Sequence, residues 1–452
     1  MDRREFIKVG SGAFFIAAAG RALGAAAPSN RVRLALVGQR KGGRGSEIRD
    51  AALRLLREGV EIGTVCDVDT REDGLPFAAA QVAERQGFAP KQERDYRKVL
   101  EDPSIDAVVL VTPDHWHAPG AIMAMQAGKH VYVEKPCAFC PDEAEKLVRV
   151  WKKTGKVLQV GTQRRSGACN IAALREIRED KVIGEPKWGK CWFVADRTGL
   201  GKLSPMEVPE GLDWDLWQGP APRRPFTNGI VHYKWHWHRH WGTGESGNNS
   251  VHYLDLARAA LGVDYPQRTV AGGGKLWIPQ DDGYDWPDLF NFTFEFPGGK
   301  TITWEGVSTM RALPYRGMYT GAMVFGTQGS VLFKPNNTAE LFDRAGKSVK
   351  LWSPEGPKDE KFVHNAQNGG SGDSTAEHLL DMVGCIRDNA PLRCRANADV
   401  GAKSTSFALF ANVAQTSGET VRTDPSTGRL ASGSAGAALW AREYEKGWEI
   451  KV

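Results

Sequence analysis

The feature that most constrains this chain is a repeated alternation of short apolar runs and amphipathic segments between residues 31 and 160. The apolar runs have the length of strands, and the segments between them have helical periodicity. Strands joined by helices pair in parallel through right-handed crossovers, which places helices on both faces of one sheet. The pattern predicts an α/β fold with a doubly wound parallel sheet, with strands at 32–37, 60–66, 107–111, 130–133 and 157–160 and helices at 46–58, 77–86, 118–127 and 142–154.

The rhythm changes after residue 180, where apolar runs follow one another with few helices between them. Pro297-Gly298-Gly299 separates two alternating runs and predicts a hairpin. We expect a mostly antiparallel sheet with one open face, and association between copies of the chain through that face. The expected strands are 187–195, 269–277, 291–296, 301–306, 323–325 and 331–333, and the expected helices are 249–261, 375–388 and 398–415.

The length of 452 residues suits two or three domains. We assign residues 31–160 to the first domain and residues 161–452, with the C-terminal helices, to a second α+β domain. Residues 1–30 differ from both, because Arg3 and Arg4 precede an apolar stretch and small residues follow at 25–27. They resemble a bacterial twin-arginine export signal with its short linker. The resemblance implies that the twin-arginine machinery exports the folded protein to the periplasm with any cofactor already loaded.

Composition and cysteine usage exclude several classes of protein. The net charge of +5 makes no case for nucleic acid, and no apolar run reaches the ~18 residues that a membrane span needs. Seven cysteines, an odd number, do not suggest a full disulfide framework. Cys137 and Cys140 have the spacing of a redox pair, but no second pair or zinc-ligand pattern accompanies them. We therefore expect a structural role for both and no metal site.

The turn after the first predicted strand, residues 37–46, is rich in glycine and basic residues. It is close to the Rossmann dinucleotide-binding fingerprint, although two extra residues separate the first glycine from the later ones. Glycines there let a pyrophosphate approach the backbone and the start of the helix. An aspartate after the second strand accepts ribose hydroxyls and repels a 2′-phosphate, which favours NAD over NADP. The predicted cofactor contacts are Gly38, Gly42, Gly43, Arg44, Gly45 and Asp67.

Three further segments carry a longer pattern: Thr112-Pro113-Asp114-His115-Trp116-His117, Glu134-Lys135-Pro136 and the segment from Gly247 to Asp255. Together with Gly326-Thr327-Gln328-Gly329 they resemble the Gfo/Idh/MocA oxidoreductases, the relatives of glucose–fructose oxidoreductase and inositol dehydrogenase. The resemblance covers nearly all of the chain after the signal. It looks closest to an exported branch that carries Trp214-Asp215-Leu216-Trp217 and Gly161-Thr162-Gln163.

The resemblance implies roles for individual residues. Lys135 would lie between the nicotinamide and the substrate, where a cationic donor lowers the cost of charge developing on a hydroxyl oxygen. Glu134 and Thr112 would line the nicotinamide ribose, and His252 would accept or relay the proton. From the residues alone, a buried helix histidine that caps or packs is the favoured interpretation of His252, and the resemblance reverses that preference. Further contacts are implied for the cofactor at Pro113, His117, Lys135 and Gln163, and for the substrate at Lys135, Gln163, Arg164, His252 and Asp255.

One position departs from the family pattern. The dehydrogenases have an aspartate four residues before the histidine, where this chain has Asn248. A neutral amide cannot stabilise the charged, protonated form of the histidine as a carboxylate can. A catalytic set of Lys135, His252 and Asn248 then implies a relay through His252 alone or a different base such as Glu245. The change is also compatible with a protein that binds a sugar and nicotinamide without catalysis.

The run Trp235-His236-Trp237-His238-Arg239-His240-Trp241 is unusual. If it is extended, the three histidines share one face and the tryptophans share the other. It can then form a sugar-binding wall with contacts from Trp237 and His238, a packed domain interface, or a metal site without a carboxylate ligand. Arg164 follows a predicted strand end, where it either engages an acidic group on the substrate or faces solvent.

Export adds a chemical constraint, because free NAD is not expected outside the cytoplasm. An exported enzyme that released NADH would stop after one turnover. We therefore expect an oxidoreductase that transfers hydride to or from a hydroxyl carbon of a sugar or polyol and keeps its NAD tightly bound. The alternative is a redox-neutral glycoside hydrolase or lyase, in which a transient keto-sugar acidifies the neighbouring C–H and permits elimination.

Overall fold

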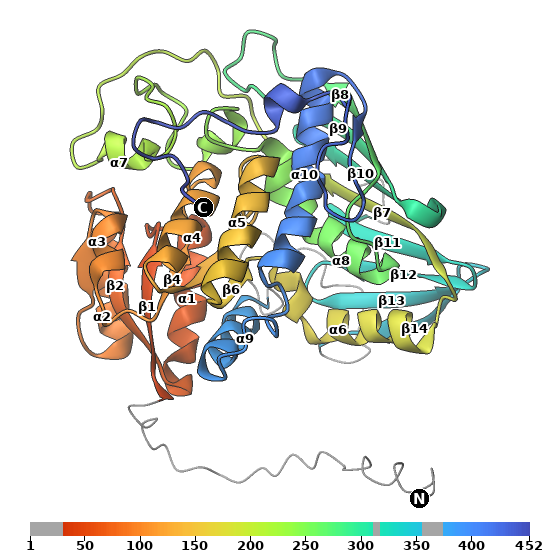
Figure 1. Ribbon diagram of the computed structural model, residues 1–452, viewed down its shortest axis with the longest axis horizontal. Coiled ribbons are helices and arrows are strands. Elements are labelled where there is room, and N and C mark those ends of the chain that lie inside the picture. Colours follow the sequence, from red (N-terminus) through yellow and green to blue (C-terminus); the bar gives the residue numbers. More distant parts are fainter. Residues whose placement is uncertain (1–29, 311–316, 355–373) are drawn as a thin grey trace, which may run out of the picture.

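The computed structural model describes residues 30–310, 317–354 and 374–452 (Figure 1). The segment predicted as an export signal therefore lies outside the described residues, apart from residue 30. Among the described residues, no helix is long and apolar enough to cross a membrane.

The first domain is the predicted doubly wound sheet. Its six strands are all parallel, in the order β3-β2-β1-β4-β5-β6. Strands buried on both faces read as continuous apolar runs, which is why most of them were visible in the sequence. Its elements are β1 Val32–Val37, α1 Gly43–Arg54, a 3₁₀ turn Leu55–Glu58, β2 Val60–Cys66, α2 Leu75–Gln86, β3 Lys91–Glu93, α3 Tyr96–Glu101, β4 Ala107–Leu110, α4 Asp114–Gln126, β5 His130–Val133, α5 Pro141–Thr154 and β6 Leu158–Val160.

The second domain is built on a nine-stranded sheet in the order β14-β13-β12-β11-β7-β10-β9-β8-β15. Neighbouring strands are antiparallel except β7 and β10. The turn Pro297–Gly299 joins β9 and β10 as the predicted hairpin. Its strands are β7 Pro186–Val194, β8 Arg268–Gly274, β9 Leu289–Glu295, β10 Thr301–Val307, β11 Thr320–Gly326, β12 Gly329–Lys334, β13 Thr338–Asp343, β14 Ser348–Trp352 and β15 Val421–Arg422.

Helices cover one face of this sheet, and the opposite face exposes Trp188, whose ring stacks on that of Phe325. The helices after residue 160 are α6 Ala168–Arg175, α7 Trp214–Gln218, α8 Val251–Leu261, α9 Thr375–Arg387 and α10 Ala398–Ser417, of which α6, α8 and α10 contact the second sheet. The 3₁₀ turns are Gln163–Ser166, Lys234–Trp237 and Ala437–Leu439, and the π-helical turns are Glu176–Asp180 and Ser246–Ser250.

The C-terminal helices pack on both sides of the domain boundary predicted at residue 160. Leu379 and Met382 of α9 belong to the core around β1, and Ala402 of α10 belongs to the core around α5. Phe407 of α10 packs in the core of the second domain. In Figure 1, α10 lies between α5 and the second sheet, so these helices join the two domains.

The segment between β7 and α8 returns to the first domain. Backbone hydrogen bonds tie it to the turn after β2, from Thr70 N to Gly211 O at 2.8 Å and from Asp213 N to Val68 O at 3.0 Å. The indole of Trp116 in α4 donates to the carbonyl of Trp217 at 2.9 Å. This segment therefore covers the edge of the first sheet at which its strands end.

Candidate active site

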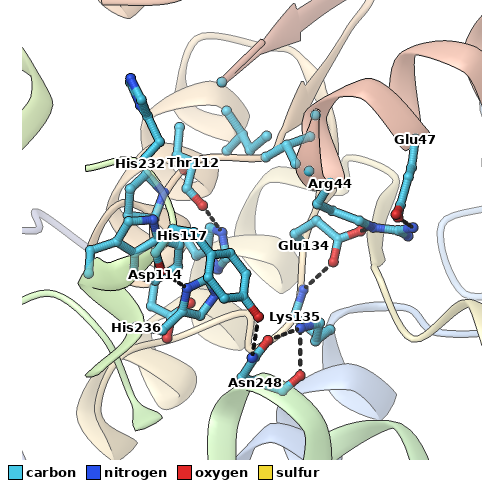
Figure 2. Close-up of a pocket in the computed structure, with 18 of the residues that line it drawn as sticks. Arg44, Glu47, Thr112, Asp114, His117, Glu134, Lys135, His232, His236 and Asn248 are labelled. Atoms are coloured by element: carbon cyan, nitrogen blue, oxygen red, sulfur yellow. Dashed lines mark hydrogen bonds and ion pairs between the residues drawn. The ribbon is translucent and has the colours of Figure 1, made fainter. Parts of the chain in front are cut away.

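A cavity of about 870 Å³ lies between the two domains. Its walls come from the carboxyl ends of β1, β2, β4, β5 and β7, from the start of α8 and from His232, Tyr233, Trp235 and His236. Open α/β sheets bind ligands in this position, because the strand ends leave a crevice there. Figure 2 shows side chains from both domains pointing into this space.

The glycine turn borders one end of the cavity. Gly38, Gly42 and Gly43 have positive φ angles of 82°, 75° and 66°. A Cβ on Gly38 would lie 2.5 Å from the carbonyl oxygen of Val111, so glycine is needed where β1 meets β4. A Cβ on Gly42 or Gly43 would meet no heavy atom within 4 Å, and α1 begins there without a side-chain cap. Uncapped N–H groups beside open space fit a phosphate group.

Arg44 lies in this turn, but its guanidinium is already paired. Nε lies 2.8 Å from Oε1 of Glu134, and Nη1 lies 3.0 Å from Oε2 of Glu47. Nη2 donates to Thr375 at 3.2 Å. In this structure Arg44 therefore links α1 to the end of β5 and to α9, besides lining the cavity (Figure 2).

Asp67 lies at the end of β2 and lines the cavity. Its Oδ1 accepts a hydrogen bond from Asp69 N at 2.9 Å. Burial raises the pKa of the Asp67 carboxyl to about 7, against the lowering effect of that bond. A carboxyl held among buried groups in this position can accept ribose hydroxyls, as the sequence predicts.

The segments after β4 and β5 form the middle of the cavity. Thr112, Pro113, His117 and Glu134 all line it. The ring of His117 lies between two carbonyl oxygens, with Nδ1 2.6 Å from Pro136 O and Nε2 2.7 Å from Thr112 O. His117 thus joins the ends of β4 and β5 through backbone oxygens.

Asp114 connects this wall to the second domain. Its Oδ2 accepts from Thr243 N at 2.9 Å and from Thr243 Oγ1 at 2.5 Å. Burial raises the pKa of Asp114, and the nearby His117 opposes that effect.

Lys135 reaches across the cavity to the second domain. Its Nζ donates to the carbonyl oxygen of Asn248 at 2.6 Å and to Oδ1 of the same residue at 3.1 Å (Figure 2). Asn248 Nδ2 donates to the Tyr233 hydroxyl at 3.4 Å. Burial lowers the pKa of Lys135, while Glu134 and Asp114 oppose that effect. An ammonium group has three donors, so one remains for a ligand.

A π-helical turn, Ser246–Ser250, places Asn248 directly before α8. Such turns are rare and frequent at functional sites. A Cβ on Gly247 would overlap the hydroxyl of Thr243, so the turn requires glycine there.

His252, in the first turn of α8, also lines the cavity. Its Nδ1 is buried and has no hydrogen-bond partner among the described residues. Burial, and then Lys135 and Arg164, lower its pKa well below the usual range. The imidazole is therefore neutral near pH 7 and can accept a proton.

The donor set fits NAD. Thr112 Oγ1 and His252 Nδ1 are buried polar atoms of the cavity without partners among the described residues, and a bound ligand would satisfy them. The open start of α1 at Gly43 would hold the pyrophosphate, and Asp67 the ribose.

The alternative base, Glu245, lies behind the cavity wall. It is fully buried, and its Oε2 lies 2.7 Å from Nε of Arg197. Its carboxylate also accepts from Asn249 and from Ser308. Because this carboxylate is held in an ion pair and does not line the cavity, its placement argues against a role as base.

The aromatic–histidine run is not extended. Residues Lys234–Trp237 form a 3₁₀ turn, so the side chains spread around a helix and do not alternate between two faces. His238 Nε2 lies 2.9 Å from Gly229 O, and Trp237 stacks on Tyr284 with ring centroids 5.1 Å apart. Neither residue lines the cavity, which contradicts their predicted contact with substrate; Trp235 and His236 line it.

Of the other predicted substrate contacts, Gln163 and Arg164 line the cavity and Asp255 does not. The Asp255 carboxylate lies 2.6 Å from Nε of Arg165 and accepts from Ser404 at 2.6 Å. It thus ties α8 to α10, and its placement does not agree with the predicted substrate contact.

Apart from Cys66, which lines the cavity at the end of β2, the cysteines do not line it. Cys137 and Cys140 are buried, and burial raises the pKa of both, to about 12 for Cys137, so neither thiol is reactive. Among the described residues, one group has metal-ligand spacing: atoms of Asp381, Cys385 and Cys394 lie within 4.8 Å of one another. Sequence spacing did not reveal this group, because the turn after α9 brings Cys394 back to the helix.

Sequence reasoning also missed contacts made by the segment between β7 and α8, here called the covering segment. Tyr233 meets Asn248, and His232 Nε2 lies 2.7 Å from Oδ2 of the buried Asp69. Arg71 also pairs with Asp69, at 2.7 Å. No local motif marks these residues, because their role arises from a long loop that returns to the first domain.

The fold and the site together define a two-domain, dinucleotide-binding protein. Family models match both parts: an oxidoreductase family with an NAD-binding Rossmann fold over residues 42–162, and the C-terminal alpha/beta domain of the same family over residues 182–271. The chain belongs to the Gfo/Idh/MocA family of oxidoreductases, and its first domain is an NAD-binding Rossmann domain.

Two curated relatives illustrate the range of this family. A glycosyl hydrolase family 109 protein of Shewanella pealeana is 29% identical over 365 residues, covering 74% of this chain and 73% of the relative. The scyllo-inositol 2-dehydrogenase (NAD(+)) of Bacillus subtilis is 30% identical over 260 residues, covering 57% of this chain and 64% of the relative.

Solved structures show the same fold. Levoglucosan dehydrogenase in complex with NADH and levoglucosan has a TM-score of 0.64 at 20% identity, over 87% of this chain and 99% of that one. Aldose-aldose oxidoreductase from Caulobacter crescentus, complexed with glycerol, has a TM-score of 0.63 at 19% identity with the same coverage.

Proposed function

We propose that this protein is an NAD-dependent oxidoreductase that acts on a hydroxyl-bearing carbon of a sugar or polyol. One observation carries the proposal: the Lys135 ammonium and the neutral, unpartnered Nδ1 of His252 line the same cavity as the NAD-binding turn. The relatives named for inositol and for levoglucosan support the substrate class.

When bound, NAD supplies the acceptor or donor of hydride. The chain's own residues handle the substrate hydroxyl and its proton. The remaining donor of Lys135 binds the hydroxyl oxygen and stabilises the negative charge that develops there. Asn248, through two oxygens, holds the ammonium in place. Neutral His252, whose Nδ1 lines the cavity without a hydrogen-bond partner among the described residues, takes the proton.

A redox-neutral glycoside hydrolase is a second candidate. The 29% identity with a glycosyl hydrolase family 109 protein over 74% of this chain favours it. The same residues would serve, with Lys135 at the oxidised hydroxyl and His252 as proton acceptor. Release of nitrophenol from nitrophenyl glycosides, without net accumulation of NADH, distinguishes this reaction from net oxidation.

We also propose export to the periplasm with NAD retained, supported by the twin-arginine pattern of residues 1–30. Association between copies through the open face of the second sheet remains a prediction, supported by the exposed Trp188 on that face.

Substitution of Lys135 tests the proposed reaction. We expect Lys135→Met to lower kcat on the best sugar or polyol by about 10²–10⁴-fold, because one charged donor to the reacting oxygen is lost. NAD-dependent oxidation in a sugar and polyol panel measures this effect. Lys234→Met, an exposed lysine of the covering segment, is the control and should keep full turnover. Unchanged turnover of Lys135→Met, in a folded protein that binds NAD, would contradict the proposal.

A further inference from the structure

The arginines that line the cavity differ in their partners. Arg164 has no carboxylate within ion-pair distance among the residues that the structure describes. Each of the other four pairs with a carboxylate: Arg40 with Asp73 at 2.7 Å, Arg44 with Glu134 at 2.8 Å, Arg94 with Asp213 at 3.2 Å and Arg197 with Glu245 at 2.7 Å.

The guanidinium of Arg164 is nevertheless held in place. It lies over the ring of Tyr253, 4.5 Å from the centroid, and its Nε is buried without a hydrogen-bond partner. The guanidinium of the next residue, Arg165, forms an ion pair with the Asp255 carboxylate. A guanidinium that is held in place and has an unused N–H donor can bind a carboxylate through two parallel hydrogen bonds.

The cavity that Arg164 lines also holds other positive side chains. Lys135, on the same cavity, donates to the neutral oxygens of Asn248, at the position where the family pattern has an aspartate. After burial, Lys135, Arg164 and Arg44 are the groups that lower the pKa of His252 most, and all three are positive. The acidic residues that line the cavity form no ion pair with Arg164 among the described contacts; they are Glu47, Asp67, Asp114, Glu134 and Asp196.

We propose that the substrate itself supplies the missing negative charge: it is a sugar acid, whose carboxylate binds Arg164 while its reacting hydroxyl lies at Lys135. An unpaired, partly buried guanidinium is costly, and a carboxylate on the substrate removes that cost when it binds. This inference rests on the proposed function and narrows its substrate class to hexuronates and related aldonates.

The test compares acid and neutral forms of one sugar. Glucuronate, galacturonate, glucose and glucose 6-phosphate are offered to the NAD-loaded wild type and to Arg164→Gln and Arg164→Lys. We expect the wild type to favour a hexuronate over its neutral aldose by at least about tenfold in kcat/KM. Arg164→Gln should raise KM for the acid by about 10–100-fold with little change in kcat, and Arg164→Lys should recover part of the loss. Arg344→Gln, which removes the same charge from an exposed turn, should change nothing.

Different failures are separable. If the wild type oxidises glucose as well as glucuronate, and Arg164→Gln changes neither, the inference falls while the oxidoreductase proposal stands. Preference for glucose 6-phosphate, or loss of NAD affinity in Arg164→Gln, would also overturn it. If no sugar is oxidised, the thermal shift that glucuronate causes in the NAD-loaded wild type still tests the site: a shift that Arg164→Gln abolishes supports it, and its absence contradicts it.

Discussion

Asp67 and His252 show how burial sets the chemistry of this cavity one side chain at a time. Burial favours the uncharged form of any titratable group. It raises the pKa of the Asp67 carboxyl to about 7 and lowers that of His252 well below its usual range. Burial thereby keeps the His252 imidazole neutral and favours the protonated form of Asp67.

The raised pKa of Asp67 leads to a prediction about stability and NAD binding. Between about pH 4 and pH 7 the folded chain holds a proton on Asp67 that the unfolded chain has lost, so this group makes stability fall as pH rises through that window. Asp67→Asn cannot ionise. We expect it to stabilise the NAD-free protein at pH 8 by about 1–2 kcal/mol and to weaken NAD binding by about 10–100-fold. Thermal unfolding and calorimetric titration with NAD measure the two effects.

Asp50→Asn is the matched control, because Asp50 is an exposed carboxylate on α1. It should change neither NAD affinity nor stability at pH 8. Full NAD affinity in Asp67→Asn would show that this carboxyl does not bind the ribose. Equal stability of Asp67→Asn and wild type at pH 8 would show that ionising Asp67 is not costly.

Residue-level prediction was strongest where a short motif carries the chemistry. Lys135, Glu134 and His252, which the Gfo/Idh/MocA resemblance singles out, line the cavity, and their roles there stay predictions. Trp237 and His238 do not, because a periodicity argument assumed a strand where the chain forms a 3₁₀ turn. A run of alternating residue types specifies which side chains share a face only after the backbone conformation is known.

At the scale of elements, the buried strands and long helices were predictable, and the marginal ones were not. β3 is three polar residues at a sheet edge, and four of the five residues of β14 are exposed. Neither has the buried apolar face by which a strand is recognised. Helices α9 and α10 were predicted, but their apolar faces do not say which domain they cover.

The packing of α10 on β6 gives an element-scale prediction. A Cβ on Gly401 would overlap the side chain of Val160, so we expect Gly401→Ala to destabilise the protein by about 1–3 kcal/mol. Gly384 in α9 is the matched control, since its Cβ would meet only Arg393, at 3.4 Å. Gly384→Ala should stabilise by about 0.5–1 kcal/mol through helix propensity. Thermal or denaturant unfolding measures both variants, and a Gly401→Ala protein as stable as wild type would contradict the close α10–β6 contact.

At the scale of the whole molecule, the proposed export raises the question of how the protein would keep a diffusible cofactor. The covering segment ties the turn after β2 to the second domain through Asp69, Arg71 and His232. Helices α9 and α10 join the two cores on the other side. A cavity bordered in this way by both domains supports the proposed retention of NAD.

Retention is directly measurable on the exported protein. We expect protein purified from the periplasm of producing cells to release about one NAD per chain when it is denatured, because loading precedes folded export and the closed cavity slows loss. Replacing Arg3 and Arg4 with lysines is the control for the route and should leave the protein in the cytoplasm, still loaded. Periplasmic protein that contains no NAD would contradict the retained-cofactor scheme, and export without the two arginines would contradict the twin-arginine route.

The sequence by itself determined the doubly wound sheet, the second antiparallel sheet, the NAD-binding turn and the family's Lys135 and His252, because these depend on local periodicity, backbone conformation and short motifs. Only the tertiary structure decided which side chains meet across the cavity. In the structure Lys135 donates to Asn248, and Glu245 forms an ion pair with Arg197. Asp255 lies in the contact between α8 and α10. Arg164 has no carboxylate partner among the described residues. Such pairings depend on distances between segments far apart in the chain, and no local pattern encodes those distances.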